Sequence, residues 1–194
     1  MDRELTFRIS AGLIFFALTM IRIYYMLVVG RLSNSLSIGG LGTPRAVVGL
    51  LFYVLILLLA VVYIFTPSWL AWAALPLPST LRWFGVAIGV GSVLLLLWVH
   101  RTLGKNFAAP GIIQARQSLV TVGPYQWIRH PMYTTFFIIS LTFALIAANG
   151  LIAVLCLLFG ILLPSIARTD EQTLLEKFGE EYREYMQRTG RFLP

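Results

Sequence analysis

Long runs of mostly apolar residues, with few charges, alternate with shorter polar segments along this chain. A bilayer core of about 30 Å is crossed by roughly 20 apolar residues of α-helix, because each residue adds about 1.5 Å. Three runs of suitable length predict spanning helices at about residues 7–29, 45–65 and 80–99. Pro67, Pro76 and Pro78 separate the second of these helices from the third.

A further uncharged run covers residues 132–167, which is too long for one crossing. The turn signal Asn149-Gly150 near its middle predicts two short spanning helices at about 132–148 and 151–167. Apolar residues recur at three- and four-residue spacing over 169–189, which predicts a polar C-terminal helix. The expected fold is an all-α integral membrane protein with five transmembrane helices, forming one domain over residues 1–194.

The polar segments indicate how the chain is oriented in the membrane. With five spans, the loop region of residues 100–131 and the C-terminal polar helix lie on the same side. The loop region contains four Lys and Arg residues and no acid, so the positive-inside rule places it in the cytosol. The two polar segments are therefore expected to meet and form one site at the cytosolic face of the membrane.

Composition agrees with a membrane protein and narrows the possible partners. Hydrophobic residues make up 58% of the chain and charged residues 12%, against about 25% charged in soluble domains. The net charge is +7, but basic groups at span ends serve membrane orientation, so no nucleic acid partner is predicted. Cys156 is the lone cysteine and has no second ligand nearby in the sequence, so no metal site is predicted.

The densest polar cluster begins before the fourth predicted span. Pro131 suits the first turn of that helix, where its missing N–H costs nothing. Arg129 and His130 are then expected at a helix N-terminus, which favours anions. Arg and His are also common anchors at the membrane interface, so each residue alone is explained by that role. The cluster as a whole, facing an acidic pair, favours function.

That acidic pair follows the fifth predicted span. Asp170 and Glu171 are the first acids after Glu4, and they suit either the N-terminal dipole of the polar helix or a ligand ammonium or hydroxyl. Arg168, two residues earlier, is able to bind a carboxylate in bidentate fashion. Arg22 is a further oddity because it lies inside the first span, where snorkelling or a structural bond is favoured over a substrate contact.

The ordered motifs of the C-terminal half resemble the isoprenylcysteine carboxyl methyltransferase family, in particular its short five-span prokaryotic and archaeal members. The likeness covers about residues 103–194. It is carried by Leu119-Val120-Thr121-Val122-Gly123-Pro124-Tyr125, by Arg129-His130-Pro131-Met132-Tyr133, by Asp170-Glu171 with Leu174, by Phe178-Gly179-Glu180-Glu181-Tyr182 and by Arg191-Phe192-Leu193-Pro194.

The resemblance implies a function and a site. The family uses S-adenosylmethionine, with S-adenosylhomocysteine as product, to methylate the carboxylate of a prenylated cysteine. It implies an acceptor site at Arg168, with Arg129 as a second catalytic candidate, and leaves open which member of the acidic pair contacts the cofactor. The implied cofactor-binding residues are Gln114, Gln117, Ser118, Leu119, Val120, Tyr125, His130, Pro131, Met132, Tyr133, Asp170 and Glu171.

Three other functions stay open on the sequence alone. Sterol-type reductases share this C-terminal architecture but use NADPH, whose 2′-phosphate needs a basic cluster, and the C-terminal helix here is acidic. Phospholipid N-methyltransferases act on an amine, which disfavours an arginine at the acceptor site. A small transporter or structural membrane protein predicts repeated halves, which this sequence does not display. The acceptor is equally open between a prenylated protein and another lipid-bearing acid.

Overall fold

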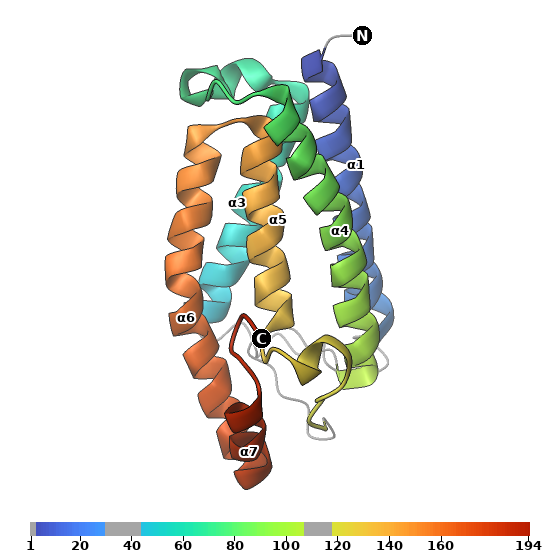
Figure 1. Cartoon of the computed structure of the whole chain (residues 1–194), viewed down its shortest axis with the longest axis vertical. Helices are drawn as coiled ribbons and strands as arrows, with labels where there is room; N and C mark the ends of the chain where they lie inside the picture. The colour runs from blue at the N-terminus through green and yellow to red at the C-terminus, as the bar shows by residue number, and fades with distance from the viewer. Residues whose placement is uncertain (1–2, 30–43, 107–117) are drawn as a thin grey trace.

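The computed structural model describes residues 3–29, 44–106 and 118–194. Its long helices are α1 Arg3–Tyr24, α3 Pro44–Phe65, α4 Ser79–Leu103, α5 Pro131–Ala147 and α6 Gly150–Phe178, followed by a short polar helix, α7 Glu180–Arg188 (Figure 1). Shorter helical turns are η1 Tyr25–Val29, η3 Pro67–Ala73, η4 Gly104–Asn106 and η5 Gly123–Gln126. These described ranges contain isolated β-bridges but no strand.

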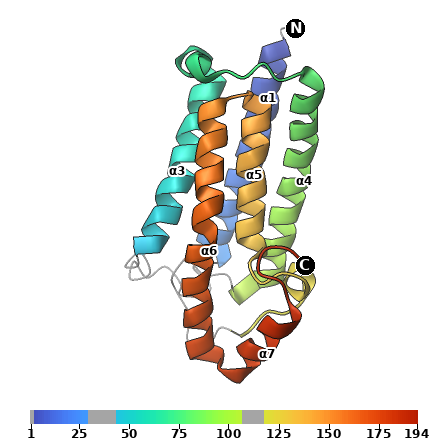
Figure 2. The ribbon, with the colours of Figure 1, turned by 60° about the vertical axis from the view of Figure 1, so that its left-hand side comes forward.

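The five long helices run side by side and together form one bundle (Figure 1, Figure 2). The segment η3 and the turn between α5 and α6 lie at one end of the bundle, together with the start of α1. At the opposite end lie η5, α7 and the last residues of the chain. The polar segments of the C-terminal third therefore share one end, which we call the α7 end.

The outer surface of the bundle is apolar, as a lipid-facing surface requires. Leu13, Phe16, Leu58 and Ile161 point outward with 58–73% of their surface exposed. In the described residues four helices are long and apolar enough to cross a membrane, and α5 is a shorter apolar helix of 17 residues. That length is at the lower limit of about 17–25 residues for a crossing. The predicted fold class, an all-α integral membrane protein, is confirmed.

Small residues allow α4 to approach its neighbours closely. A Cβ added at Gly89 would lie 2.7 Å from Ile14 Cδ1 and 2.9 Å from Thr142 Cγ2. At Gly85 it would lie 3.0 Å from Leu145 Cβ, also on α5. Two glycines of α4 thus replace side chains that would separate the helices, as expected for packing in a membrane.

The predicted turn at residues 149–150 is confirmed, and hydrogen bonds of the Asn149 side chain stabilise it. Asn149 is the N-cap of α6, and its side-chain oxygen accepts a hydrogen bond from the Ile152 amide at 3.3 Å. Its side-chain nitrogen donates to the Leu70 carbonyl of η3 at 2.8 Å. One buried side chain therefore holds the α5–α6 hairpin against the segment that precedes α4.

An arginine with a complete set of partners ties the helices together at the end opposite α7. Arg82 Nη1 lies 2.8 Å from Glu4 Oε2, Nε donates to the Ile146 carbonyl at 2.8 Å, and Nη2 donates to the Tyr63 hydroxyl at 3.0 Å. These contacts join α1, α3, α4 and α5. They also show how this fold satisfies a guanidinium placed between helices.

The prediction of a separate polar helix over 169–189 is wrong in one respect. The spanning helix α6 does not end near residue 167 but continues without a break to Phe178. The break falls at Gly179, whose φ of +55° lies in the left-handed region that favours glycine. Asp170 and Glu171 therefore lie in the interior of α6, so the alternative explanation that they stabilise a helix N-terminus is also wrong. The helix continues past the apolar run because polar residues also support helical backbone hydrogen bonds.

Candidate active site

The site forms where the last residues of the chain return to the start of α5. Backbone hydrogen bonds join the two segments: the Arg129 amide donates to the Gly190 carbonyl at 2.8 Å, and the His130 amide to the Arg191 carbonyl at 3.1 Å. The Gly190 amide donates in turn to the Trp127 carbonyl at 3.1 Å. This pairing brings two distant parts of the sequence side by side and positions Arg191 beside His130.

Glu171 is the centre of the charged cluster, in contact with Arg129, His130 and Arg191. Its side chain lies buried on α6, and its carboxylate forms ion pairs with two arginines. Arg191 donates from Nε to Oε1 at 3.0 Å and from Nη2 to Oε2 at 2.6 Å, which is a bidentate contact. Arg129 donates from Nε to Oε1 at 3.1 Å. Both carboxylate oxygens are thus bound by arginine, and the contact raises the pKa of Arg191.

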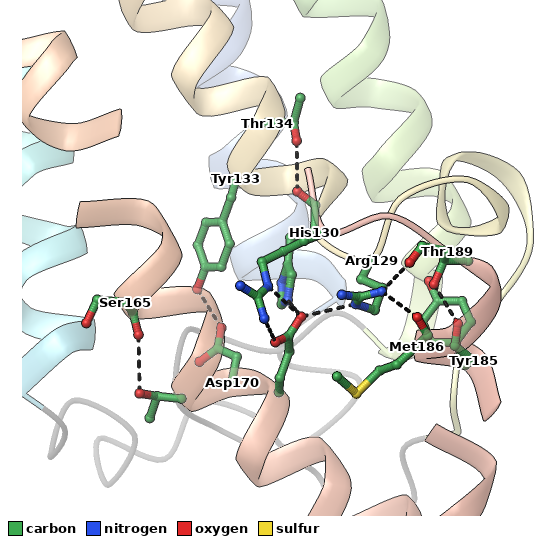
Figure 3. Close-up of polar contacts among 12 residues, drawn as sticks. Arg129, His130, Tyr133, Thr134, Ser165, Asp170, Tyr185, Met186 and Thr189 are labelled. Carbon is green, nitrogen blue, oxygen red and sulfur yellow. Dashed lines mark hydrogen bonds and ion pairs between the residues drawn. The ribbon is translucent and has the colours of Figure 1, made fainter. Parts of the chain in front are cut away.

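Arg129 also binds the last turn of α7. Its Nη1 donates to the Met186 carbonyl at 2.9 Å and to the Thr189 carbonyl (Figure 3). Carbonyls at the end of a helix have no partner within the helix, and a cation there is favourable. Arg129 therefore links α6 to α7, and the contacts described give its guanidinium a structural task. Its predicted catalytic role stays a prediction.

His130 lies against the same carboxylate but is not fully engaged. Its Nε2 is 3.4 Å from Glu171 Oε1, and this buried nitrogen makes no hydrogen bond with the described residues. The imidazole stacks on the ring of Tyr133, with centroids 5.5 Å apart. As predicted, Pro131 is the first residue of α5, so the start of that helix fixes both His130 and Tyr133.

Asp170 is held differently from its neighbour. The Tyr133 hydroxyl donates to Asp170 Oδ2 at 2.6 Å (Figure 3). Within the described residues no hydrogen bond reaches the other oxygen, Oδ1, and the side chain is half-buried. The two predicted acids are therefore distinct in chemistry: Glu171 has both oxygens bound by cations, whereas Asp170 keeps one acceptor oxygen for another group.

The segment before α5 contributes residues at the margin of this cluster. Gly123 has φ +60°, and an added Cβ would lie 2.7 Å from Thr102 Oγ1, so glycine lets η5 pack on the end of α4. The Tyr125 carbonyl accepts from the Tyr185 hydroxyl at 2.6 Å, which joins η5 to α7. The amide of Ser118 donates to Asn106 Oδ1 at 3.0 Å. The segment is thus attached to both α4 and α7.

The predicted site residues that the structure describes fall into three groups. Arg129, His130, Tyr133, Asp170 and Glu171 come together directly. A second group lies at the same end without contacting Glu171 or Asp170: Ser118, Leu119, Val120, Tyr125, Pro131 and Met132. Arg168 is exposed, and no ion pair or hydrogen bond joins it to the described residues. Gln114 and Gln117 lie outside the described residues.

Sequence reasoning missed the roles of two residues, Arg191 and His100. Arg191 was part of the quoted motif but received no role. His100 was placed in a loop, whereas α4 continues to Leu103 and buries His100 completely, with Nδ1 2.9 Å from the Leu96 carbonyl. Of the two roles expected for Arg22, snorkelling and a structural bond, the structure shows a contact inside the bundle: Nη1 lies 3.5 Å from Met132 Sδ.

Comparisons with known proteins relate this chain to membrane methyltransferases and to metal-resistance proteins. The family model described as the isoprenylcysteine carboxyl methyltransferase (ICMT) family matches residues 85–176. A cobalt-zinc-cadmium resistance protein of Cupriavidus metallidurans is 33% identical over 121 residues, which are 61% of this chain and 50% of that protein. A protein-S-isoprenylcysteine O-methyltransferase of Tribolium castaneum is 34% identical over 98 residues, which are 48% of this chain and 34% of that protein. The chain thus spans half or less of the length of these relatives.

A solved structure shares the fold. The eukaryotic intramembrane Ras methyltransferase ICMT superposes with a TM-score of 0.54 at 24% identity, covering 77% of this chain and 50% of that one. No group of three or more His, Cys, Asp or Glu residues suited to a metal ion occurs in the described part of the chain. The resemblance to the isoprenylcysteine carboxyl methyltransferase family that the sequence indicated is confirmed, and the chain has the membrane fold of that family.

Proposed function

We propose that this chain is a membrane-embedded methyltransferase that uses S-adenosylmethionine to methylate the carboxylate of a lipid-bearing acceptor, such as a prenylated cysteine. The observation that carries the proposal is the Glu171 cluster. Two motifs of the matched family region and the C-terminal Arg191 assemble on one buried carboxylate, at the end of a bundle that is otherwise poor in charge.

The residues at the α7 end suit the polar end of S-adenosylmethionine. A carboxylate with a free oxygen is a good partner for an ammonium group or a ribose hydroxyl, and Asp170 Oδ1 is such an oxygen. The buried His130 Nε2 is a second polar atom without a hydrogen-bond partner among the described residues. We propose that Asp170 contacts the cofactor directly, while Glu171 positions Arg129, His130 and Arg191 around it.

The remaining cofactor contacts follow the family resemblance. Tyr125, Met132 and residues 118–120 lie at the same end of the bundle and are proposed to line the cofactor site. Gln114 and Gln117 are proposed for the same role on sequence alone. When bound, S-adenosylmethionine supplies a methyl group activated by its sulfonium sulfur. The protein then has to bind the cofactor and the acceptor, orient them toward each other and exclude water.

The proposed reaction makes modest demands on the protein. A free α-carboxylate has a pKa of about 3.5 and is ionised at neutral pH, so no general base is needed. Its oxygen has to be aligned with the methyl group, and positioning of this kind supplies up to about 7–11 kcal/mol of the barrier. Burial of the Glu171 cluster within α5, α6 and the returning C-terminal segment provides a rigid frame for that alignment.

The acceptor is proposed to arrive through the membrane, and the cofactor from the cytosol. The outward faces of the helices are apolar, so a lipid tail is able to lie against them while its polar head reaches the α7 end. Residues 118–131 lie at the same end, and the loop region to which they belong has four Lys and Arg residues and no acid in its sequence, so the positive-inside rule supports a cytosolic location. Membrane lipids are therefore the expected surroundings of the reaction.

Calorimetry in detergent with S-adenosylhomocysteine and NADPH tests this assignment most simply. We expect S-adenosylhomocysteine to bind at one site and NADPH to give no specific heat. A Glu180→Gln variant serves as the control, because Glu180 is an exposed acid paired with Arg183 on α7. Specific binding of NADPH, with no binding of S-adenosylhomocysteine, would favour the reductase alternative instead.

A further inference from the structure

Arg22 is a charged residue within the first apolar helix, and its guanidinium is turned toward the interior of the bundle. Its Nη1 lies 3.5 Å from Met132 Sδ on α5. The guanidinium carbon lies 4.9 Å from the ring centre of Phe136 on α5 and 5.7 Å from that of Tyr53 on α3. Side chains from two other helices thus surround one cation.

The surroundings of Arg22 lack an anion among the residues that the structure describes. No carboxylate there lies within ion-pair distance of Arg22, and its Nε is buried without a hydrogen-bond partner. Aromatic faces and a thioether sulfur are weak partners for a guanidinium. A half-buried, underpaired cation is costly, and in a membrane helix such a residue marks a functional site by default.

Other inward-facing arginines in this fold have carboxylate, hydroxyl or carbonyl oxygens as hydrogen-bond partners. Arg82 has Glu4, Tyr63 and a carbonyl, and Arg129 has Glu171 and two carbonyls. Arg8, on the same helix as Arg22, donates to the Ile64 carbonyl. The difference at Arg22 is thus local and points to a ligand that supplies the negative charge.

The position of Arg22 relates it to the candidate active site. Its two contacts on α5, Met132 and Phe136, follow His130 in the first two turns of that helix. The intervening Tyr133 binds Asp170. Arg22 therefore lies on the bundle side of the cluster in which we place the cofactor.

We infer that Arg22 binds the carboxylate of the lipid-bearing acceptor and holds it for methylation. This inference rests on the proposed function. It assigns acceptor binding to Arg22, whereas the sequence favoured Arg168 or Arg129 for that role. Arg129 is occupied by Glu171 and the end of α7, and Arg168 is exposed. The planar guanidinium suits a carboxylate, and the low dielectric of the surroundings strengthens the pair.

The charge balance of the reaction gives Arg22 a role in product release as well. A carboxylate oxygen forms a bond to the methyl carbon while the bond from that carbon to sulfur breaks. The carboxylate and the sulfonium become a neutral ester and a neutral thioether, and no proton is released. Arg22 therefore attracts the acid and loses its ionic partner once the ester has formed.

Binding of an acid and its neutral analogue tests this inference independently of turnover. Calorimetry in detergent with S-adenosylhomocysteine present would compare N-acetyl-S-farnesyl-cysteine with its carboxamide. We expect the wild type to bind the acid at least about 30-fold more tightly, as for a buried charge pair. Arg22→Gln should abolish that preference, and Arg22→Lys should keep part of it. Arg8→Gln, which removes the same charge from the opposite end of α1, should leave it unchanged.

Three outcomes would overturn the role of Arg22. The first is a wild type that binds acid and carboxamide equally. The second is an Arg22→Gln protein that binds S-adenosylhomocysteine normally and still prefers the acid. The third is loss of S-adenosylhomocysteine binding in both Arg22 variants at unchanged helical content, which would assign Arg22 to the cofactor. A wild type that prefers the acid but methylates no carboxylate would instead contradict the proposed function alone.

Discussion

Arg191 forms a bidentate salt bridge with Glu171, with Nε 3.0 Å from Oε1 and Nη2 2.6 Å from Oε2. The two residues are 20 positions apart and lie on opposite sides of the turn at Gly179. The contact therefore closes a loop that consists of the end of α6, α7 and the returning C-terminal segment. That loop brings the last residues of the chain to the start of α5, where the candidate site is built.

Glu171→Gln is expected to destabilise the fold strongly. The amide keeps the shape of the side chain but removes the anion, which leaves the buried Arg129 guanidinium without its counterion. Breaking a buried pair in this way costs about 3–5 kcal/mol. Thermal unfolding in detergent should show a clear loss for Glu171→Gln. Glu180→Gln removes an exposed partner of Arg183 and should cost about 0–1 kcal/mol. Equal stability of the two variants would contradict the central position of Glu171.

Asp170→Asn is expected to weaken cofactor binding without unfolding the protein. The substitution retains an acceptor oxygen for Tyr133 but removes the charge proposed to meet the cofactor's polar end. A charged hydrogen bond contributes about 1.5–3 kcal/mol, so affinity for S-adenosylhomocysteine should fall about 10- to 150-fold. Tyr133→Phe, which removes only the positioning hydrogen bond, should have a smaller effect. Calorimetry of both variants measures this, and unchanged affinity in Asp170→Asn would remove Asp170 from the cofactor site.

Arg168→Ala separates the position favoured by sequence from the one favoured by structure. The Arg168 side chain is exposed and makes no hydrogen bond or ion pair to the described residues, so we expect its removal to change the KM for the acid acceptor by less than about threefold. Arg22→Gln should raise that KM far more. Steady-state kinetics with saturating S-adenosylmethionine distinguishes the two. A large increase in KM for Arg168→Ala alone would return the acceptor role to that residue.

Topology is testable by accessibility labelling in a Cys156→Ser background, which removes the lone, buried cysteine. Single cysteines at the exposed positions Val122 and Glu184 should react with a membrane-impermeant reagent from the cytosolic face. A cysteine at the exposed Ser68, in η3 at the other end of the bundle, should react from the opposite face. Labelling of Val122 and Glu184 from different faces would separate the two segments that build the proposed site.

The sequence predicted the bundle well because lipid imposes a simple requirement on it. Each crossing needs a long apolar run, and such runs are visible without knowledge of packing. Asn149 and Pro131 were found for the same reason, since a turn and a helix start are local properties of the chain. The end of α6 was misplaced because the charges at Asp170 and Glu171 end the lipid-facing run but not the helix itself.

The parts of the site that the sequence did not reveal depend on contacts between distant residues. The pairing of residues 127–130 with 190–191 follows from how α7 folds back, and no periodicity encodes it. For this reason Arg191 had no role, and Arg129 was expected to be available to the substrate. The direction of Arg22 was equally hidden, because hydropathy identifies a charge within a span but not the helix face on which its partners lie.

Methyl transfer itself is the most direct test of the proposed function. Purified protein in detergent or liposomes is incubated with S-adenosylmethionine labelled in the methyl group and with one of three acceptors: N-acetyl-S-farnesyl-cysteine, its methyl ester or phosphatidylethanolamine. We predict label in a base-labile ester, formed from the free acid alone. Label on the amine lipid, or no label on the acid from a protein that binds S-adenosylhomocysteine, would contradict a carboxyl methyltransferase.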